Sequence, residues 1–390
     1  MADRSILGAA DVDDTTFLEI VARALGEHQE DVTVLGSEAS VVPYTLVAIT
    51  TAGRYWVTAR AATPTGERDV RMFVKHVQSW SRSPLFQQVP EELRALAEAS
   101  VPWRTEPLIY ESDLRHRLPP GLTMPVALHV AFLDEASAAI WLPALNVDER
   151  DWQTVDFAQA AHLLGRLAGS AEVAELARVG EPDDGPRTLR TYADGRLAGQ
   201  VAPMLRSGDL WRVPWVGEAF EPALRERLLD ALEQVPGWVE EVEAGPLAVA
   251  HGDACPNNLL RTAGSDDITL IDYGFWGRQR RGFDLGQLLV GDVQVGRRTA
   301  DTLPEVEREI VPAFVSGLHE EGVDVDETSV ARAHALHLMV FTGLSTPLVM
   351  PPDPDAAPPD PATRAALVHD ARERAAISRF CLGLVEATTG

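Results

Sequence analysis

The chain has 390 residues and a formal net charge of −25, with 34 Lys plus Arg against 59 Asp plus Glu. Such acidity argues against binding to nucleic acid or to an anionic membrane surface, because phosphates would be repelled. The composition, 45% hydrophobic and 24% charged, is that of an ordinary globular protein, and the length predicts two lobes.

Three further features exclude other classes. No stretch approaches the ~18 uninterrupted apolar residues of a membrane span, and the acidic N-terminus lacks the apolar core of a secretory signal. Two cysteines, Cys255 and Cys381, cannot build a disulfide framework. We therefore expect a cytoplasmic protein, either a monomer or a homodimer.

The N-terminal part of the chain predicts a helix followed by a small antiparallel sheet. Residues 14–28 have the spacing of an amphipathic helix, with Asp13 or Asp14 as its cap. Short runs rich in β-branched and aromatic residues predict strands at 32–36, 43–50, 54–60, 70–77, 126–132 and 138–142. Turns are expected at 51–53 and 63–66, and a helical region at 91–118 ends at Pro119-Pro120-Gly121.

Helical periodicity dominates after Pro143, with one β interruption between 247 and 275. The expected helices cover 157–167, 222–243, 305–321, 329–341 and 362–387. A Pro-rich loop at 351–361 separates the last two and is expected to be extended. The pattern predicts an α+β fold with two lobes, a sheet-bearing N-lobe over 1–143 and a mainly helical C-lobe over 144–390.

The residues with the clearest catalytic pattern lie in the β-rich segment between 247 and 275. The segment HGDACPNN (251–258) precedes IDYG (271–274), so that Asp253, Asn258 and Asp272 follow or end apolar strands. A hairpin turn at 263–265 would bring Asn258 and Asp272 to the same end, and carboxylate and amide oxygens are ligands suited to Mg²⁺. Each residue alone could be an ordinary turn or cap residue. Together, at this spacing, they indicate phosphoryl transfer, which needs a metal and a carboxylate that orients the acceptor hydroxyl.

HGDACPNN followed by IDYG resembles the Brenner-type motif of the aminoglycoside phosphotransferase and choline kinase family, relatives of protein kinases. The resemblance implies that Asp253 is the catalytic base and that Asn258 and Asp272 hold Mg²⁺. It further implies that Asp284 braces the catalytic loop and that His251 is a scaffold residue bonded to nearby backbone. Cys255 is expected to be a small filler residue.

The same resemblance implies a lysine on an N-lobe strand that binds the α- and β-phosphates of ATP, paired with a helical glutamate. Lys75 is the one lysine of the chain, since the other 33 of its 34 cations are arginines. Taken alone, that count could be an accident of composition. For its partner we choose Glu106, because PWRTEPLIYES (102–112) resembles an actinobacterial subgroup of these enzymes; the rival carboxylates are Glu91, Glu92, Glu98 and Glu111.

Two nucleotide contacts depart from the family pattern. No GxGxxG is present, and the loop expected after the first strand offers Ser37 and Ser40 to a phosphate instead. Pro143 stands where relatives often carry an acidic residue, and it has no N–H. A backbone contact to adenine would therefore shift to Leu142 or Leu145, which leaves ATP and GTP as alternatives.

Other clusters have plain structural interpretations. Arg278, Arg280 and Arg281 could contact an anionic substrate or simply form a solvated loop, and His334 and His337 fit a helix core.

The predicted activity is transfer of the γ-phosphoryl group of ATP or GTP, with Mg²⁺, to a hydroxyl of a small molecule. Candidate acceptors are an aminoglycoside, another aminosugar, a nucleoside antibiotic or a metabolic alcohol. A kinase-like regulatory protein without catalysis remains an alternative, as does a protein kinase. Only eleven residues separate Asp272 from Asp284, which leaves little room for a protein-kinase activation segment.

Overall fold

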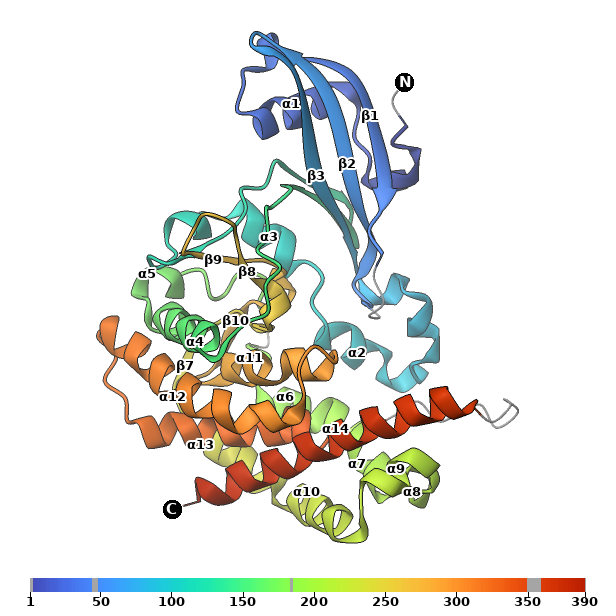
Figure 1. Ribbon diagram of the computed structural model, residues 1–390, viewed down its shortest axis with the longest axis vertical. Coiled ribbons are helices and arrows are strands. Elements are labelled where there is room, and N and C mark those ends of the chain that lie inside the picture. The colour runs from blue at the N-terminus through green and yellow to red at the C-terminus, as the bar shows by residue number, and fades with distance from the viewer. Residues whose placement is uncertain (1–2, 44–47, 183–184, 349–358, 390) are drawn as a thin grey trace. The chain divides into compact units, whose positions relative to one another are not determined.

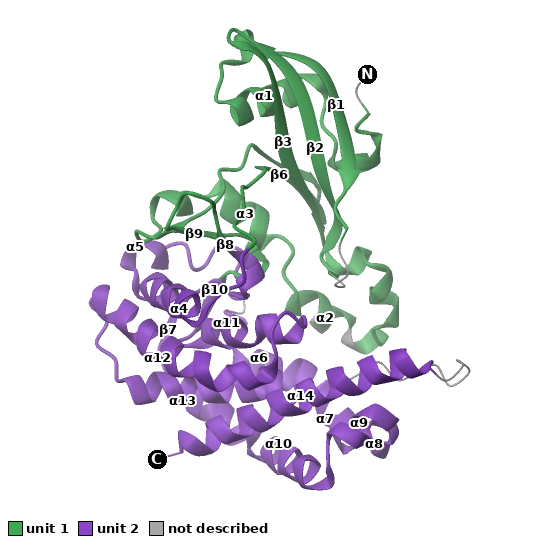
Figure 2. Cartoon of the chain, viewed as in Figure 1, with its two compact units in different colours: residues 1–149, 260–276 green, residues 150–259, 277–390 purple. Residues whose placement is uncertain are grey.

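A computed structural model describes residues 3–43, 48–182, 185–348 and 359–389. The chain forms two compact units, distinguished by colour in Figure 2. Unit 1 comprises Met1–Glu149 and Leu260–Trp276, and unit 2 comprises Arg150–Leu259 and Gly277–Gly390. The segment 260–276, which carries Asp272, thus belongs to the same unit as the N-terminal sheet.

Unit 1 is built on a five-stranded sheet of order β1-β2-β3-β6-β5, antiparallel throughout (Figure 1). Its strands are β1 (Thr33–Val41), β2 (Thr51–Thr63), β3 (Gly66–Gln78), β5 (His129–Asp134) and β6 (Ser137–Pro143). The long β2–β3 hairpin turns at the expected position, where Thr63 pairs with Gly66. The unit also contains α1 (Asp14–Leu25), α2 (Arg94–Ser100) and α3 (Thr105–Glu111).

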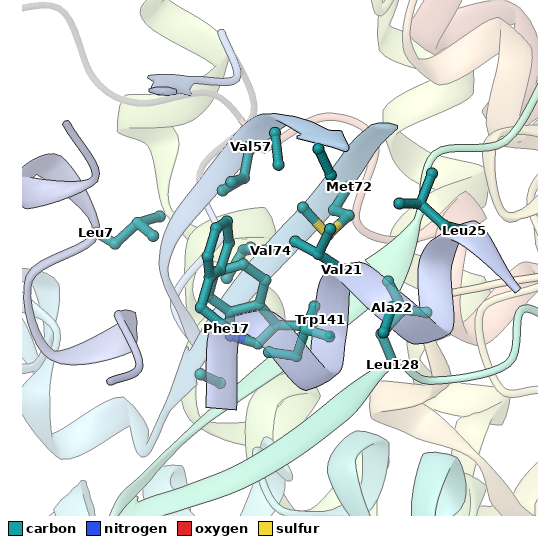
Figure 3. Close-up of a cluster of buried hydrophobic side chains, with 14 of the residues drawn as sticks. Leu7, Phe17, Val21, Ala22, Leu25, Val57, Met72, Val74, Leu128 and Trp141 are labelled. Atoms are coloured by element: carbon teal, nitrogen blue, oxygen red, sulfur yellow. The ribbon is translucent and has the colours of Figure 1, made fainter. Parts of the chain in front are cut away.

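One face of this sheet is covered by α1. The helix begins at the predicted cap, where the Asp13 side chain accepts a hydrogen bond from the Thr16 N–H, and it ends at Gly26 in the left-handed conformation. Phe17 from the helix packs edge-on against the fully buried Trp141 of β6, with ring centroids 6.0 Å apart (Figure 3). Met72 and Val74 of β3 join the same cluster, which assigns their face of the sheet to the core.

Several sequence expectations differ from the structure. The strand expected at 32–36 runs on to Val41, and Thr51–Gly53, expected as a turn, opens β2. The helical region expected at 91–118 is broken into short pieces, and Pro102 lies in the break between α2 and α3. Residues 44–47 of the strand expected at 43–50, and residues 351–358 of the Pro-rich loop expected at 351–361, lie outside the described residues.

The short strands around the HGD and IDYG segments form two further sheets. One has the order β4-β9-β8, from β4 (Leu122–Thr123), β9 (Ile268–Leu270) and β8 (Leu259–Arg261). The other pairs β7 (Leu247–Ala250) with β10 (Gly277–Arg280), a strand that the sequence analysis did not predict. The HGD segment thus lies between β7 and β8, and the IDYG segment lies between β9 and β10.

Unit 2 is mainly helical, which together with the antiparallel sheet of unit 1 confirms the α+β class. Its longer helices are α4 (Thr154–Gly169), α10 (Pro222–Glu243), α11 (Phe283–Gln294), α12 (Leu303–Glu320), α13 (Glu327–Leu338) and α14 (Pro361–Ala387). Shorter ones are α5 (Ala171–Ala174), α6 (Leu189–Tyr192), α7 (Ala202–Arg206), α8 (Gly208–Arg212) and α9 (Pro214–Ala219). Among the described residues, no helix combines the length and the apolar character needed to cross a bilayer.

Two glycines allow α4 and α12 to pack closely. A Cβ on Gly165 would lie 2.0 Å from the carbonyl oxygen of Phe314, and one on Gly317 would lie 2.0 Å from that of His162. Either contact is far inside van der Waals range, so the two backbones can approach this closely only because both positions lack a side chain.

Candidate active site

Lys75 lies in the middle of β3, between Arg54 of β2 and Ile140 of β6. Because strand side chains alternate between faces, Lys75 lies on the face opposite Met72 and Val74. It therefore points away from the α1 core even though it is 6% exposed.

Two carboxylates bind the Lys75 ammonium. Its Nζ lies 2.5 Å from Oε2 of Glu106 on α3 and 2.9 Å from Oδ1 of Asp272. The Lys75 and Glu106 side chains are 7% and 4% exposed, whereas that of Asp272 is 35% exposed. The structure thus brings three of the predicted residues together within unit 1.

The rival glutamates lie elsewhere. Glu98 accepts a hydrogen bond from the Ser79 hydroxyl, while Glu91, Glu92 and Glu111 are exposed. Among the described carboxylates, those within ion-pair distance of Lys75 are Glu106 and Asp272.

Burial and charge act in opposite directions on this cluster. Burial raises the pKa of Glu106 to about 7, against the lowering effect of the Lys75 charge. For Lys75, burial lowers the pKa, but the charges of Asp272 and Glu106 outweigh it and the net shift is upward. The lysine is therefore firmly protonated, while Glu106 is the member that can exchange a proton near neutral pH.

Asp272 has an unusual backbone. Its φ of 62° is the one positive value among the described non-glycine residues. A left-handed residue without a glycine's freedom costs of order 1–3 kcal/mol and persists where the surroundings impose it. Here it lies two residues after the end of β9 and precedes the single turn Tyr273–Phe275, whose Tyr273 ring is fully buried. With this backbone conformation, the Asp272 carboxylate lies in hydrogen-bond contact with Lys75.

The HGD segment forms a second group of predicted residues, in unit 2. The chain leaves β7 at His251 and turns at Gly252, whose φ is 87°. Asn258 Nδ2 donates to the Asp253 carbonyl at 2.9 Å and to Asp253 Oδ2 at 3.0 Å. Since both bonds use the amide nitrogen, they leave Oδ1, the metal-binding atom of an amide, for a cation.

Asp284 fastens this loop from the first turn of α11. Its carboxylate accepts hydrogen bonds from the backbone N–H of His251 at 2.8 Å and of Gly252 at 2.9 Å. Burial raises the pKa of Asp284 to about 6, although both hydrogen bonds favour the charged form. His251 is fully buried and its Nδ1 accepts from the Asp253 N–H at 3.4 Å, a contact within the loop itself.

The predicted nucleotide contacts at Ser37, Ser40 and Leu142 are placed differently from expectation. Residues 36–40 are strand and not loop, because Ser37 pairs with Ala59 and Ser40 with Trp56. Ala59 belongs to the α1 core, so the Ser37 side chain lies on the face opposite Lys75, where its hydroxyl accepts from Arg4 Nη1 at 3.4 Å. Ser40 is on the face of Lys75 and is exposed.

Leu142 is opposite Phe73 in the β3–β6 pairing. The Ala144 N–H donates to the Arg71 carbonyl at 3.1 Å, and hydrogen-bonded pairs alternate along an antiparallel ladder. The N–H and C=O of Leu142 are consequently directed at Phe73. Pro143, which has no N–H, falls at a position where β3 requires no donor.

Sequence reasoning missed three side chains on the face of Lys75. Arg54 of β2 is directly opposite Lys75 of β3. The next pair on the same face is Trp56 of β2 and Phe73 of β3, whose rings pack edge-on with their centroids 5.4 Å apart. Both rings are half-buried. Side chains alternate between the two faces of a strand, so every second residue from Lys75 lies on its face. That signal identifies Phe73 from the sequence, and it identifies Arg54 and Trp56 once the register of β2 against β3 is known.

The arginines near Asp284 have mostly structural partners. Arg278 forms a bidentate ion pair with Glu181. Arg280 donates hydrogen bonds to the Glu243 carboxylate at 2.7 Å and to the Gly245 carbonyl at 2.5 Å. Arg281 is half-buried, and burial lowers the pKa of its guanidinium. The first two positions lie in β10, and their arginines fasten it to neighbouring segments of unit 2.

Cys255 and the two helical histidines are packing residues. A Cβ added to Gly291 of α11 would lie 2.7 Å from Cys255 Cβ, which shows how tightly the loop packs on that helix. His334 and His337 are buried, and neither ring nitrogen of His334 has a hydrogen-bond partner within the described part of the chain. Burial lowers the pKa of His334 to about 3 and that of His337 to about 4.

The model of the phosphotransferase enzyme family matches residues 54–313, which include every one of these charged site residues. The chain therefore belongs to this family and is a phosphotransferase. No curated protein matches the sequence.

Among solved structures, the chain is similar to a spectinomycin phosphotransferase in complex with ADP and spectinomycin. The identity is 12% over 90% of this chain and 92% of that one, with a TM-score of 0.45. It is similar to an amicoumacin kinase in complex with AMP-PNP and Ca²⁺, at 13% identity over 96% of both chains and a TM-score of 0.44. Choline kinase from Cryptosporidium parvum matches at 13% identity over 96% of both chains, with a TM-score of 0.46. At such low identity the family model, and not these structures, carries the assignment.

Proposed function

We propose that the protein transfers the γ-phosphoryl group of ATP or GTP to a hydroxyl of a small molecule, with an antibiotic or aminosugar as the first acceptors to test. The observation that carries the proposal is the buried Lys75–Glu106 pair beside Asp272, in a chain with no second lysine. An ammonium is a compact point charge that binds phosphate oxygens, and the chain otherwise uses arginine for its cations.

The donor set suits Mg²⁺. Asn258 offers its Oδ1 because Nδ2 is engaged with Asp253, and Asp272 offers a carboxylate that is over a third exposed. Both are hard oxygen ligands of the kind that Mg²⁺ prefers. A Mg²⁺ ion held by these ligands would neutralise charge on the phosphates of a nucleotide.

Asp253 is the proposed base. In the transfer, the acceptor oxygen forms a bond to the γ-phosphorus while the bond from that phosphorus to the β–γ bridging oxygen breaks. The hydroxyl proton passes to the Asp253 carboxylate, and the nucleoside diphosphate leaves. Asp284 supports this step indirectly, because its bonds to the His251 and Gly252 N–H groups hold the turn that carries Asp253.

Lys75 would bind the α- and β-phosphates, with Glu106 keeping its ammonium oriented. Phe73 and Trp56, half-buried on the same face of the sheet, are the candidates for packing against the base. The Leu142 side chain lies on this face too, because Leu142 is opposite Phe73, and its backbone groups are directed at β3. A protein that consumes ATP or GTP works where the nucleotide is present, which supports a cytoplasmic location.

The test is a mass-spectrometric screen of hydroxylated antibiotics, aminosugars and choline with Mg²⁺ and either ATP or GTP. Wild-type protein is expected to add roughly 80 Da, one phosphoryl group, to at least one acceptor, and the Asp253→Asn variant to add none. Full transfer by Asp253→Asn would refute the assigned base. Phosphate on protein alone would indicate a protein kinase, and nucleotide binding without any transfer would indicate a regulatory protein.

A further inference from the structure

The charge balance around Lys75 is unfavourable for an incoming polyphosphate. One ammonium faces the carboxylates of Glu106 and Asp272, so the fully ionised cluster carries one net negative charge. Most of this charge is buried, where electrostatic interactions are screened less than in water. A nucleoside triphosphate is itself strongly anionic. The Mg²⁺ proposed at Asp272 would offset part of that charge, and a cation on the sheet beside Lys75 would offset more of it.

Arg54 supplies a cation on the neighbouring strand, β2. It is directly opposite Lys75 in the β2–β3 pairing, so both side chains lie on the same face, with Cβ atoms about 4.5–5.5 Å apart. The Arg54 charge lowers the pKa of Glu106, which places the guanidinium within electrostatic range of the buried pair. Arg54 also marks the end of the β1–β2 pairing, since its carbonyl accepts from the Val42 N–H at 2.9 Å.

We propose that Arg54 is a second phosphate-binding residue of the nucleotide site. The inference rests on the proposed function and deepens it, because it adds to the phosphate site a residue outside the HGD and IDYG segments. A guanidinium presents two parallel N–H donors to phosphate oxygens, whereas Lys75 acts as a point charge. Arg54 would thus offset the surplus negative charge of the cluster and orient the phosphates that Lys75 attracts.

The same strand supplies a matched comparison. Arg60 is six residues further along β2, so it lies on the same face as Arg54. It is 64% exposed and pairs at 2.5 Å with Glu67 across the hairpin. Arg60 is thus an ordinary surface cation, and its substitution removes the same charge from the same strand away from Lys75.

The experiment measures binding of Mg²⁺–AMP-PNP and of adenosine by isothermal titration calorimetry to wild type, Arg54→Gln, Arg54→Lys and Arg60→Gln. We expect Arg54→Gln to weaken AMP-PNP binding roughly 10- to 100-fold and to leave adenosine binding unchanged, because only the phosphates lose a charge-assisted contact. Arg54→Lys is expected to retain part of the affinity, and Arg60→Gln all of it.

Three results would overturn the proposal. Wild-type affinity of Arg54→Gln for AMP-PNP would show that the arginine does not touch the phosphates. An equal loss of adenosine affinity would show that the substitution disturbs the sheet, and an equal loss in Arg60→Gln would show a general charge effect. If wild-type protein binds neither Mg²⁺–AMP-PNP nor Mg²⁺–GMP-PNP, the proposed function itself fails.

Discussion

The Lys75–Glu106 pair makes a prediction about stability that is independent of any substrate. Lys75→Met keeps most of the volume of the lysine stem but removes the ammonium from a site where both partners are almost fully buried. Glu106 is then left as a buried carboxylate without the ammonium that binds it. Removing one partner of a buried ion pair costs about 3–5 kcal/mol, because the stranded charge stays desolvated.

The penalty should grow with pH. The pKa of Glu106 is raised to about 7 in the folded protein, above its ordinary 4.5. A carboxyl group whose pKa is raised by folding contributes stability that is fully present below its pKa in the unfolded chain. That stability is lost as the pH rises through its pKa in the folded protein. Without Lys75 the folded pKa rises further, so the loss continues above pH 7 at about 1.4 kcal/mol per pH unit. Lys75→Met is therefore more destabilised, relative to wild type, at pH 8 than at pH 7.

Urea unfolding followed by tryptophan fluorescence measures this, since Trp141 is buried in the same sheet. The double variant Lys75→Met/Glu106→Gln should regain a large part of the lost stability at pH 8, because the stranded carboxylate is gone. Arg60→Met, which breaks an exposed pair, should cost less than about 1 kcal/mol. If Lys75→Met costs no more than this control, or if Glu106→Gln restores nothing, the buried-pair reasoning is wrong.

Three further predictions concern unit 2. Asp284→Ala removes both hydrogen bonds to the HGD turn and should lower kcat at least tenfold with a smaller change in KM, measured by steady-state kinetics once an acceptor is known. His334→Leu should reduce the loss of stability in acid, because burial lowers the pKa of His334 from 6.5 to about 3. In the wild type this group therefore lowers the free energy of unfolding by about 2 kcal/mol between pH 7 and pH 5. Urea unfolding at the two pH values measures the difference. Gly317→Ala should lower the thermal midpoint strongly because its Cβ meets a carbonyl at 2.0 Å, whereas Gly237→Ala in α10, with nothing within 4 Å, should be neutral or stabilising.

Each of these has a result that contradicts it. Unchanged kcat in Asp284→Ala would mean that the turn holds its shape without the carboxylate. An identical loss of stability on acidification in wild type and His334→Leu would mean that this imidazole does not stay neutral in the fold. Equal thermal midpoints for the two alanine variants would mean that α4 and α12 can separate at no cost.

Much of the fold followed from local pattern. The helix at α1 was predicted from its cap and apolar spacing, and α10 was predicted with its observed bounds, because each has a clear start signal and a sustained period. The bounds of β1 were missed because serine and glycine at 36–40 resemble a loop, while pairing with β2 keeps them extended. β10 was missed because Gly-Arg-Gln-Arg has little strand propensity, and its pairing with β7 decides its conformation.

The amino-acid sequence by itself determined which residue types could carry the chemistry: one lysine, the HGD and IDYG segments, and an aspartate thirty-one residues after Asp253. These are covalent facts, and their spacing was enough to predict phosphoryl transfer. Tertiary structure alone decided which glutamate among five meets Lys75 and which strand brings Arg54 beside it. The reason is that a partner in space depends on sheet register and helix docking, and a shift of one residue in either would direct the same side chains to the opposite face.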